Sequence, residues 1–247
     1  MENENYEVKK RVTWIQQILA TSHLDGIVVG NSGGKDSATV LALSKLATKN
    51  VLSVIMPCKS LNSDEATAKR IAAKFEVESI KVELSRSYDL LQEEIFKAVK
   101  TTNQKAYLNI KPRLRMTVLY TVAQCKHYLV AGTGNRSEIE LGYFTKWGDG
   151  VCDFDPIADL TVEEVRRLGT YLGVPKSIIN KPPSAGLFYG QTDEGELGLK
   201  YSDIDKYLLT GVCEDPAIKV KIEAYQQGSR HKRRTPLMYP EEINPEA

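Results

Sequence analysis

Cysteine is scarce in this chain, and both long apolar runs and a strong net charge are missing. Four cysteines occur among 247 residues and none forms a Cys-x-x-Cys pair, which argues against a zinc ribbon, an iron–sulfur site or a disulfide framework. No apolar stretch approaches the roughly 20 residues that cross a membrane, and the polar segment from Met1 to Lys10 is not a signal peptide. We therefore expect a cytoplasmic protein with no membrane partner.

The charge balance and two missing motifs narrow the ligand class further. A net charge of +1 gives no bulk attraction to nucleic acid, so no nucleic-acid partner is expected. There is no Gly-x-x-x-x-Gly-Lys-Ser/Thr run, and no Gly-x-Gly-x-x-Gly follows a strand. Any site for a polyanion must therefore be local and built from other residues.

The most informative segment is a small-residue loop that follows an apolar strand and contains one carboxylate. It reads Gly30-Asn31-Ser32-Gly33-Gly34-Lys35-Asp36-Ser37. Adjacent glycines let backbone N–H groups approach an anion, and the helix expected to start at Ser37 directs its positive end to the same place. Asp36 would repel a phosphate unless a divalent cation lay between them. The loop predicts Mg²⁺ with a nucleotide, and the competing interpretation is a glycine turn with a helix cap.

Strand and helix signals alternate along the first half of the chain. Expected helices cover residues 5–21, 37–48, 63–75, 87–100 and 114–125, and expected strands cover 26–30, 51–56, 77–84 and 128–131. This spacing predicts an α/β fold, doubly wound, with a mostly parallel sheet flanked by helices on both faces. The length favours a single domain over residues 1–247.

Ligands of such sheets bind at the carboxyl ends of the strands, so those ends should converge. The strand at 128–131 is followed by Gly132-Thr133-Gly134-Asn135, which is again small and polar. Glu138 comes within one further helical turn. On its own it would be an ordinary surface glutamate, but here it is a candidate second carboxylate for the metal on Asp36.

Beyond residue 150 the sheet signal fades. Thr161 and Glu164 have the spacing of a helix capping box. Residues 181–198 form a segment too long for a connector, which is typical of a lid or a disordered loop. The basic tail at residues 228–247 is, by its charge alone, most often a solvated run.

Several segments occur in an order that points to one family. They are Asn109-Ile110-Lys111-Pro112-Arg113-Leu114-Arg115-Met116, Gly132 to Glu138, Gly142-Tyr143-Phe144-Thr145-Lys146-Trp147-Gly148-Asp149-Gly150, Lys181-Pro182-Pro183-Ser184, Gly190-Gln191-Thr192-Asp193-Glu194 and Ser229-Arg230-His231-Lys232-Arg233. Ser-Gly-Gly-x-Asp-Ser itself resembles the pyrophosphate loop of the N-type ATP pyrophosphatases. Together the segments resemble the ammonia-dependent NAD⁺ synthetases over about residues 26–236.

The resemblance implies a ligase that amidates nicotinic acid adenine dinucleotide (deamido-NAD⁺) with ammonia. A carboxylate is a poor electrophile, because attack by ammonia would have to expel oxide. Transfer of AMP from ATP to the carboxylate supplies a leaving group, and ammonia then displaces AMP to give NAD⁺. Catalysis of this kind depends mainly on positioning and charge neutralisation.

The resemblance also implies a role for each matching residue. The loop residues Gly30, Asn31, Ser32, Gly33, Gly34, Lys35, Asp36 and Ser37 would bind ATP together with Thr133 and Ser184, and Asp36 and Glu138 would hold Mg²⁺. Deamido-NAD⁺ would contact Arg113, Lys146, Asp153, His231 and Lys232, which favours a basic tail that orders only with substrate. Asp36 and Asp149 are the catalytic candidates. Asp149 would bind ammonium and help to deprotonate it, and a turn aspartate is its equal alternative.

Two positions depart from the family pattern. Val162 stands where the family often has a lysine that contacts ATP, and Pro112 stands where alanine is common. Lys35 is a candidate to supply the missing positive charge. We expect Lys35→Gln to raise the KM for ATP in steady-state kinetics, and an unchanged KM would remove the hypothesis.

The nitrogen source and the assembly follow from the resemblance as well. The chain has no room for the amidase domain of glutamine-using relatives, so free or delivered ammonia is expected, and the family's shared site implies a homodimer. The amphipathic helix at 5–21 adds weak support, because its apolar face needs a partner. The rival interpretations are a tRNA-modifying ligase of the same superfamily, which would want paired cysteines or a broad basic face, and a non-catalytic nucleotide-binding module.

Overall fold

The computed structural model describes residues 2–60, 62–188 and 190–239. One parallel sheet has the strand order β3-β2-β1-β4, with β1 (Gly26–Gly30), β2 (Val51–Ile55), β3 (Glu78–Lys81) and β4 (Tyr128–Ala131). The helices are α1 (Glu2–Ser22), α2 (Lys35–Ala47), α3 (Asn62–Lys74), α4 (Ser85–Val99), α5 (Gln104–Leu108), α6 (Ile110–Lys126), α7 (Arg136–Leu141), α8 (Val162–Tyr171), α9 (Lys176–Ile179), α10 (Asp193–Leu197), α11 (Tyr201–Thr210), α12 (Pro216–Gly228) and the short 3₁₀ helix η1 (Arg230–Lys232). Within these residues, no helix combines the length and the apolar character needed to span a bilayer.

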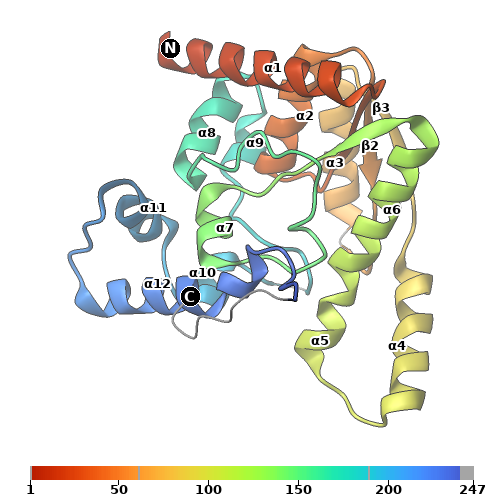
Figure 1. The fold of residues 1–247 in the computed structure, drawn as a ribbon, viewed down its shortest axis with the longest axis vertical. Coiled ribbons are helices and arrows are strands. Elements are labelled where there is room, and N and C mark those ends of the chain that lie inside the picture. Colours follow the sequence, from red (N-terminus) through yellow and green to blue (C-terminus); the bar gives the residue numbers. More distant parts are fainter. Residues whose placement is uncertain (1, 61, 189, 240–247) are drawn as a thin grey trace.

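Helices cover both faces of the sheet, as expected for a doubly wound fold (Figure 1). Side chains of a strand alternate between faces, and β1 shows the consequence because it is buried on both. Ile27 and Val29 join the core under α1, α2, α3 and α8. Val28 joins the second core under α4 and α6. The predicted α/β architecture is confirmed.

Helix α1 buries its apolar face within its own chain. Val8 and Ile15 belong to the first core, and α1 packs on α2 and α8 (Figure 1). Arg11, near the middle of α1, donates to both carboxylate oxygens of Asp159, at 2.7 and 2.9 Å. The expectation that the apolar face of this helix needs a second chain is therefore wrong, because α2 and α8 of the same chain cover it.

The C-terminal third forms a third core beside the sheet. Leu141 of α7, Val162 of α8, Leu197 of α10, Ile204 of α11 and Ile222 of α12 meet there, and each is at most 2% exposed. The expected capping box is present, because Thr161 accepts from the backbone N–H of Glu164 and the Glu164 carboxylate accepts in return. This core packs α7 against α11 and α12, and α7 follows the carboxyl end of β4, where the site lies.

Candidate active site

The loop after β1 is held by its own side chains, which engage two of its backbone N–H groups: Gly33 donates to Asn31 Oδ1 and Gly34 donates to Ser32 Oγ. Asn31, 3% exposed, donates to Ser53 Oγ at 3.0 Å and to the carbonyl of Ala68 at 2.9 Å, and it accepts from the N–H of Gly33. Gly33 has φ +80°, and a Cβ there would lie 2.9 Å from the carbonyl oxygen of Asp64. The turn therefore requires glycine at position 33.

Helix α2 begins at Lys35, two residues earlier than expected, and no side chain caps its N-terminus at Gly34. Its first-turn N–H groups are thus available to an anion. The hydroxyls of Ser32 and Ser37 lie 3.1 Å apart beside them. These hydroxyls are candidate donors for a phosphate group.

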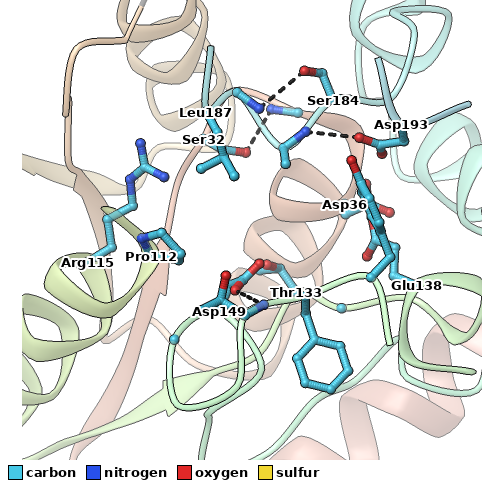
Figure 2. Close-up of a pocket in the computed structure, with 18 of the residues that line it drawn as sticks. Ser32, Asp36, Pro112, Arg115, Thr133, Glu138, Asp149, Ser184, Leu187 and Asp193 are labelled. Carbon is cyan, nitrogen blue, oxygen red and sulfur yellow. Dashed lines mark hydrogen bonds between the residues drawn. The ribbon is translucent and has the colours of Figure 1, made fainter. Parts of the chain in front are cut away.

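Two carboxylates from separate elements meet at this helix end. Asn135 caps α7 in a second capping box, in which its backbone N–H donates to Glu138 Oε2 at 3.1 Å. The amide of the same Asn135 donates to Asp36 Oδ1 at 3.2 Å. One residue therefore links the two candidate metal ligands, which lie side by side in Figure 2. Whether they share one cation stays a prediction.

The charges around this pair are unbalanced. Burial raises the pKa of Glu138 well above its ordinary value, and the neighbouring charge of Asp36 adds to the shift. Burial also raises the pKa of Asp193, which is 2% exposed. Lys35, 4% exposed, places its Nζ 2.7 Å from Asp36 Oδ2. Burial acts to lower the pKa of Lys35, but the charges of Asp36 and Glu138 outweigh it and raise that pKa.

The residues present suit a magnesium ion that arrives with a nucleotide. Within the described residues, no group of three or more His, Cys, Asp or Glu side chains could hold a metal. Mg²⁺ bound with a substrate phosphate needs only one or two protein carboxylates. Asp36 and Glu138 are such a pair, and their mutual repulsion is what a cation would relieve.

The turn after β4 depends on a buried carboxylate that the sequence did not suggest. Asp155 accepts from the N–H of Gly134 at 2.9 Å and from the N–H of Ile157 at 3.1 Å. A Cβ on Gly132 would lie 2.6 Å from Asp155 Oδ2, so the turn and the carboxylate fit closely. Asp155 thereby fixes the turn that carries Thr133.

Asp155 should give the protein an unusual dependence of stability on pH. Burial raises its pKa to about 6, against about 3.9 when unfolded. The folded state then binds more protons between these values, so the contribution of Asp155 to the unfolding free energy is fully present below about pH 4 and is lost as the pH rises through 6. We expect at most about 3 kcal/mol from this group. Denaturant unfolding from pH 4 to 7 should show a slope that Asp155→Asn removes, and identical profiles would contradict the assignment.

A single cavity of about 1250 Å³ joins these elements. Most of the predicted site residues line it: Gly30, Asn31, Ser32, Gly34, Lys35, Asp36, Ser37, Thr133, Glu138, Asp149, Ser184, Arg113, Lys146, His231 and Lys232. Such a volume exceeds the roughly 300–1,000 Å³ of a typical ligand pocket. The cavity therefore has space for more than one nucleotide-sized ligand.

Asp149 lines the same cavity as Asp36, and both are labelled in Figure 2. Its Oδ1 accepts from the N–H of Thr145 at 2.8 Å, as a turn aspartate would. Burial of the carboxylate raises its pKa, whereas the charges of Arg115 and Lys232 lower it. The structural and the chemical interpretations of Asp149 are thus compatible, since one oxygen is not engaged by this bond.

The segment 229–233 closes the cavity against the C-terminal end of α7. Lys232 Nζ donates to the carbonyls of Gly142 and Phe144, at 2.7 and 2.8 Å. Arg233 donates to the carbonyls of Ile139 and Glu140, at 3.2 and 2.9 Å. Cations at the carbonyl end of a helix are favourable. The expectation that the tail orders only with substrate stays a prediction, and its residues 240–247 lie outside the described residues.

Two predicted site residues do not line the cavity. Asp153 accepts from the N–H of Val130 at 2.7 Å and from Tyr120 Oη at 3.2 Å, outside the cavity. Gly33 faces α3. Val162, 1% exposed, packs in the third core, so no charge reaches the cavity from that position. The substrate role of Asp153 stays a prediction.

Sequence reasoning missed three residues of the site. Asn135 was readable, because Asn-x-x-Glu is a capping-box pattern. Asp193 and Arg115 lie in the family-like segments 190–194 and 109–116, but no local pattern gave either of them a role. Asp193 closes the 183–193 loop by accepting from the N–H of Ala185 at 3.0 Å (Figure 2), and Arg115 donates to the carbonyl of Met56 at 3.3 Å beside the cavity.

Comparisons with known proteins agree with this geometry. The model of the NAD synthase family matches residues 7–236. An NH(3)-dependent NAD(+) synthetase from Carboxydothermus hydrogenoformans is 48% identical over 236 residues, covering 94% of this chain and 97% of that protein.

Two solved structures have the same fold over nearly their whole length. An NMN synthetase from Francisella tularensis is 33% identical with a TM-score of 0.90, covering 96% of this chain and 98% of that one. An NH3-dependent NAD synthetase from Campylobacter jejuni, in complex with the nitrate ion, is 30% identical with a TM-score of 0.78, covering 95% and 98%. On the strength of the family match and these relatives, the chain belongs to the NAD synthase family.

Proposed function

We propose that this protein is a ligase that amidates deamido-NAD⁺ with ammonia and consumes ATP, giving NAD⁺, AMP and pyrophosphate. The observation that carries the proposal is the meeting of Asp36 and Glu138, linked by Asn135, at the uncapped N-terminus of α2. They lie in the same cavity as four cationic or titratable side chains for a second anion, Arg113, Lys146, His231 and Lys232. Its curated relatives are NH(3)-dependent NAD(+) synthetases.

The donors at the start of α2 suit the phosphates of ATP. First-turn N–H groups and the hydroxyls of Ser32 and Ser37 would bind them. Thr133, which follows β4, and Ser184, in the loop between α9 and α10, would contact the nucleotide. Asp36 and Glu138 would hold Mg²⁺, which when bound neutralises charge on the phosphates. The acid of the dinucleotide would then take AMP from ATP, with release of pyrophosphate.

The second half of the reaction needs a group that accepts protons near the acyl carbon. Asp149 would bind ammonium through its free oxygen and accept a proton as ammonia displaces AMP. Lys232 is preoriented for an anionic substrate, because two of its three N–H donors already bind carbonyls. The third N–H is available to a phosphate of the dinucleotide.

A homodimer is part of the proposal, and α4 supports it. Leu90, Leu91, Phe96 and Val99 are 39–58% exposed along this helix, which is more apolar surface than a free helix face usually presents. Asp153 lies outside the cavity of its own chain, so a contact with the dinucleotide would require a second copy. Light scattering coupled to size exclusion would measure the mass. A cytoplasmic location stays a prediction.

A second candidate is amidation of a mononucleotide instead of a dinucleotide. The Francisella NMN synthetase superposes with a TM-score of 0.90, above the 0.78 of the Campylobacter NAD synthetase. The chemistry at the carboxylate would be the same, and the two substrates differ by an adenylate half.

Turnover assays with ATP, Mg²⁺, ammonium and either acid separate these functions. We expect NAD⁺ and AMP in equal amounts from nicotinic acid adenine dinucleotide, with a kcat/KM above that for nicotinic acid mononucleotide. A preference for the mononucleotide would establish the second candidate. Nucleotide binding without either product, or turnover that requires tRNA, would overturn both.

A further inference from the structure

The acidic pair in the cavity already has a cation of its own. Lys35 is buried, and its Nζ lies 2.7 Å from Asp36 Oδ2, the oxygen that Asn135 does not engage. Its side chain is 3% exposed, whereas that of Asp36 is 19% exposed. The ammonium is therefore more deeply buried than the carboxylate that it pairs with, although Lys35 still lines the cavity.

The charged groups around this ammonium are mostly acidic. Asp36, Glu138 and Asp193 face it from α2, α7 and α10, and Arg166 of α8 contributes an opposing charge. A divalent cation on Asp36 would add two positive charges beside Lys35, in surroundings where little water screens them. Without a phosphate to bind both cations, metal and ammonium must compete for the same carboxylate.

We propose that Lys35 is an internal counter-ion that competes with Mg²⁺ for Asp36, so that the nucleotide-free protein binds a divalent metal weakly. The inference rests on the proposed metal role of Asp36 and Glu138. Nucleotide phosphates that enter with the metal give the ammonium a new acceptor, which removes the competition. Metal binding thereby becomes coupled to nucleotide binding through one side chain.

The test measures binding of Mn²⁺, a probe for Mg²⁺, to the nucleotide-free protein by electron paramagnetic resonance of the free ion. Lys35→Met keeps the apolar stem and removes the charge, and we expect it to bind Mn²⁺ at least fivefold more tightly than the natural protein. Lys97→Gln, which removes one positive charge from an exposed ion pair on α4, should leave the affinity unchanged. The double variant Lys35→Met with Asp36→Asn should lose the gain.

Equal or weaker Mn²⁺ binding by Lys35→Met would overturn the inference. So would a gain that survives in the double variant. Lys35→Gln provides a second comparison if thermal melts show that the Met variant is unfolded. The turnover assay tests the proposed function independently of this binding test. If the natural protein forms no NAD⁺ and AMP, the proposed function fails, whatever the Mn²⁺ affinities are.

Discussion

Replacing Asp36 with asparagine is expected to lower the rate of NAD⁺ formation by about 10²–10³, the effect typical of removing one preorganised electrostatic group. The amide is isosteric, so the hydrogen bond between Asp36 Oδ1 and Asn135 Nδ2 has a counterpart in the variant. What is lost is the negative charge that would hold the metal beside Glu138. The measurement is kcat and KM for ATP at saturating Mg²⁺.

A matched control makes this result specific to the site. Glu214→Gln removes the same charge from an exposed ion pair with Lys206, and such exposed pairs are worth about 0–1 kcal/mol. Its activity should stay within twofold of the natural protein. Full activity of Asp36→Asn would contradict the proposed role of the carboxylate.

The second large effect is expected on stability, at Gly142. This residue ends α7 with φ +63°, a conformation that strains any residue with a Cβ by about 1–2 kcal/mol. A Cβ there would also overlap Cβ and Oγ of Ser229, and overpacking typically adds about 1–3 kcal/mol. Gly142→Ala should therefore lower the unfolding free energy by about 2–5 kcal/mol in denaturant titrations.

A double variant separates the two causes of this loss. Ser229→Gly removes the overlapping atoms, so it should be less damaging in the Gly142→Ala background than in the natural protein. The loss of stability that remains in the double variant comes from the backbone strain at position 142 and from the missing hydrogen bond between Arg233 and Ser229 Oγ. Strictly additive free energies would show that the overlap is relieved elsewhere.

The sheet was predictable because its strands are bounded by strong local signals. Buried apolar runs before Gly30 and Gly132 located β1 and β4, and β-branched residues located β2. The edge strand β3 covers only Glu78–Lys81 of the residues 77–84 expected, although Val82 and Leu84 still donate to the carbonyls of Ile55 and Pro57 beyond it. The helix expected at 114–125 begins earlier, at Ile110, since Pro112 is tolerated in a first turn.

The site was predictable in composition but not in connectivity. Strand-end motifs identified Asp36 and Glu138, yet nothing local indicated that Asn135 would join them. Asp155 and Asp193 act through contacts that only folding brings together, and their neighbours in sequence do not distinguish them from surface aspartates. The substrate residues were assigned by family resemblance rather than by physical reasoning, and their roles await the assays above.

The contacts at the C-terminal end of α7 can form only late in translation, because their donors lie near the end of the chain. Arg233 binds the carbonyl of Ile139 across 94 positions of the chain, so the donor leaves the ribosome long after the helix it secures. A nascent polypeptide arrested before residue 229 would carry the β1 loop and both candidate metal-binding carboxylates, but would lack the contacts of residues 232 and 233 with the C-terminal end of α7. Enzymatic competence should accordingly be gained late in translation, once the last basic segment has emerged.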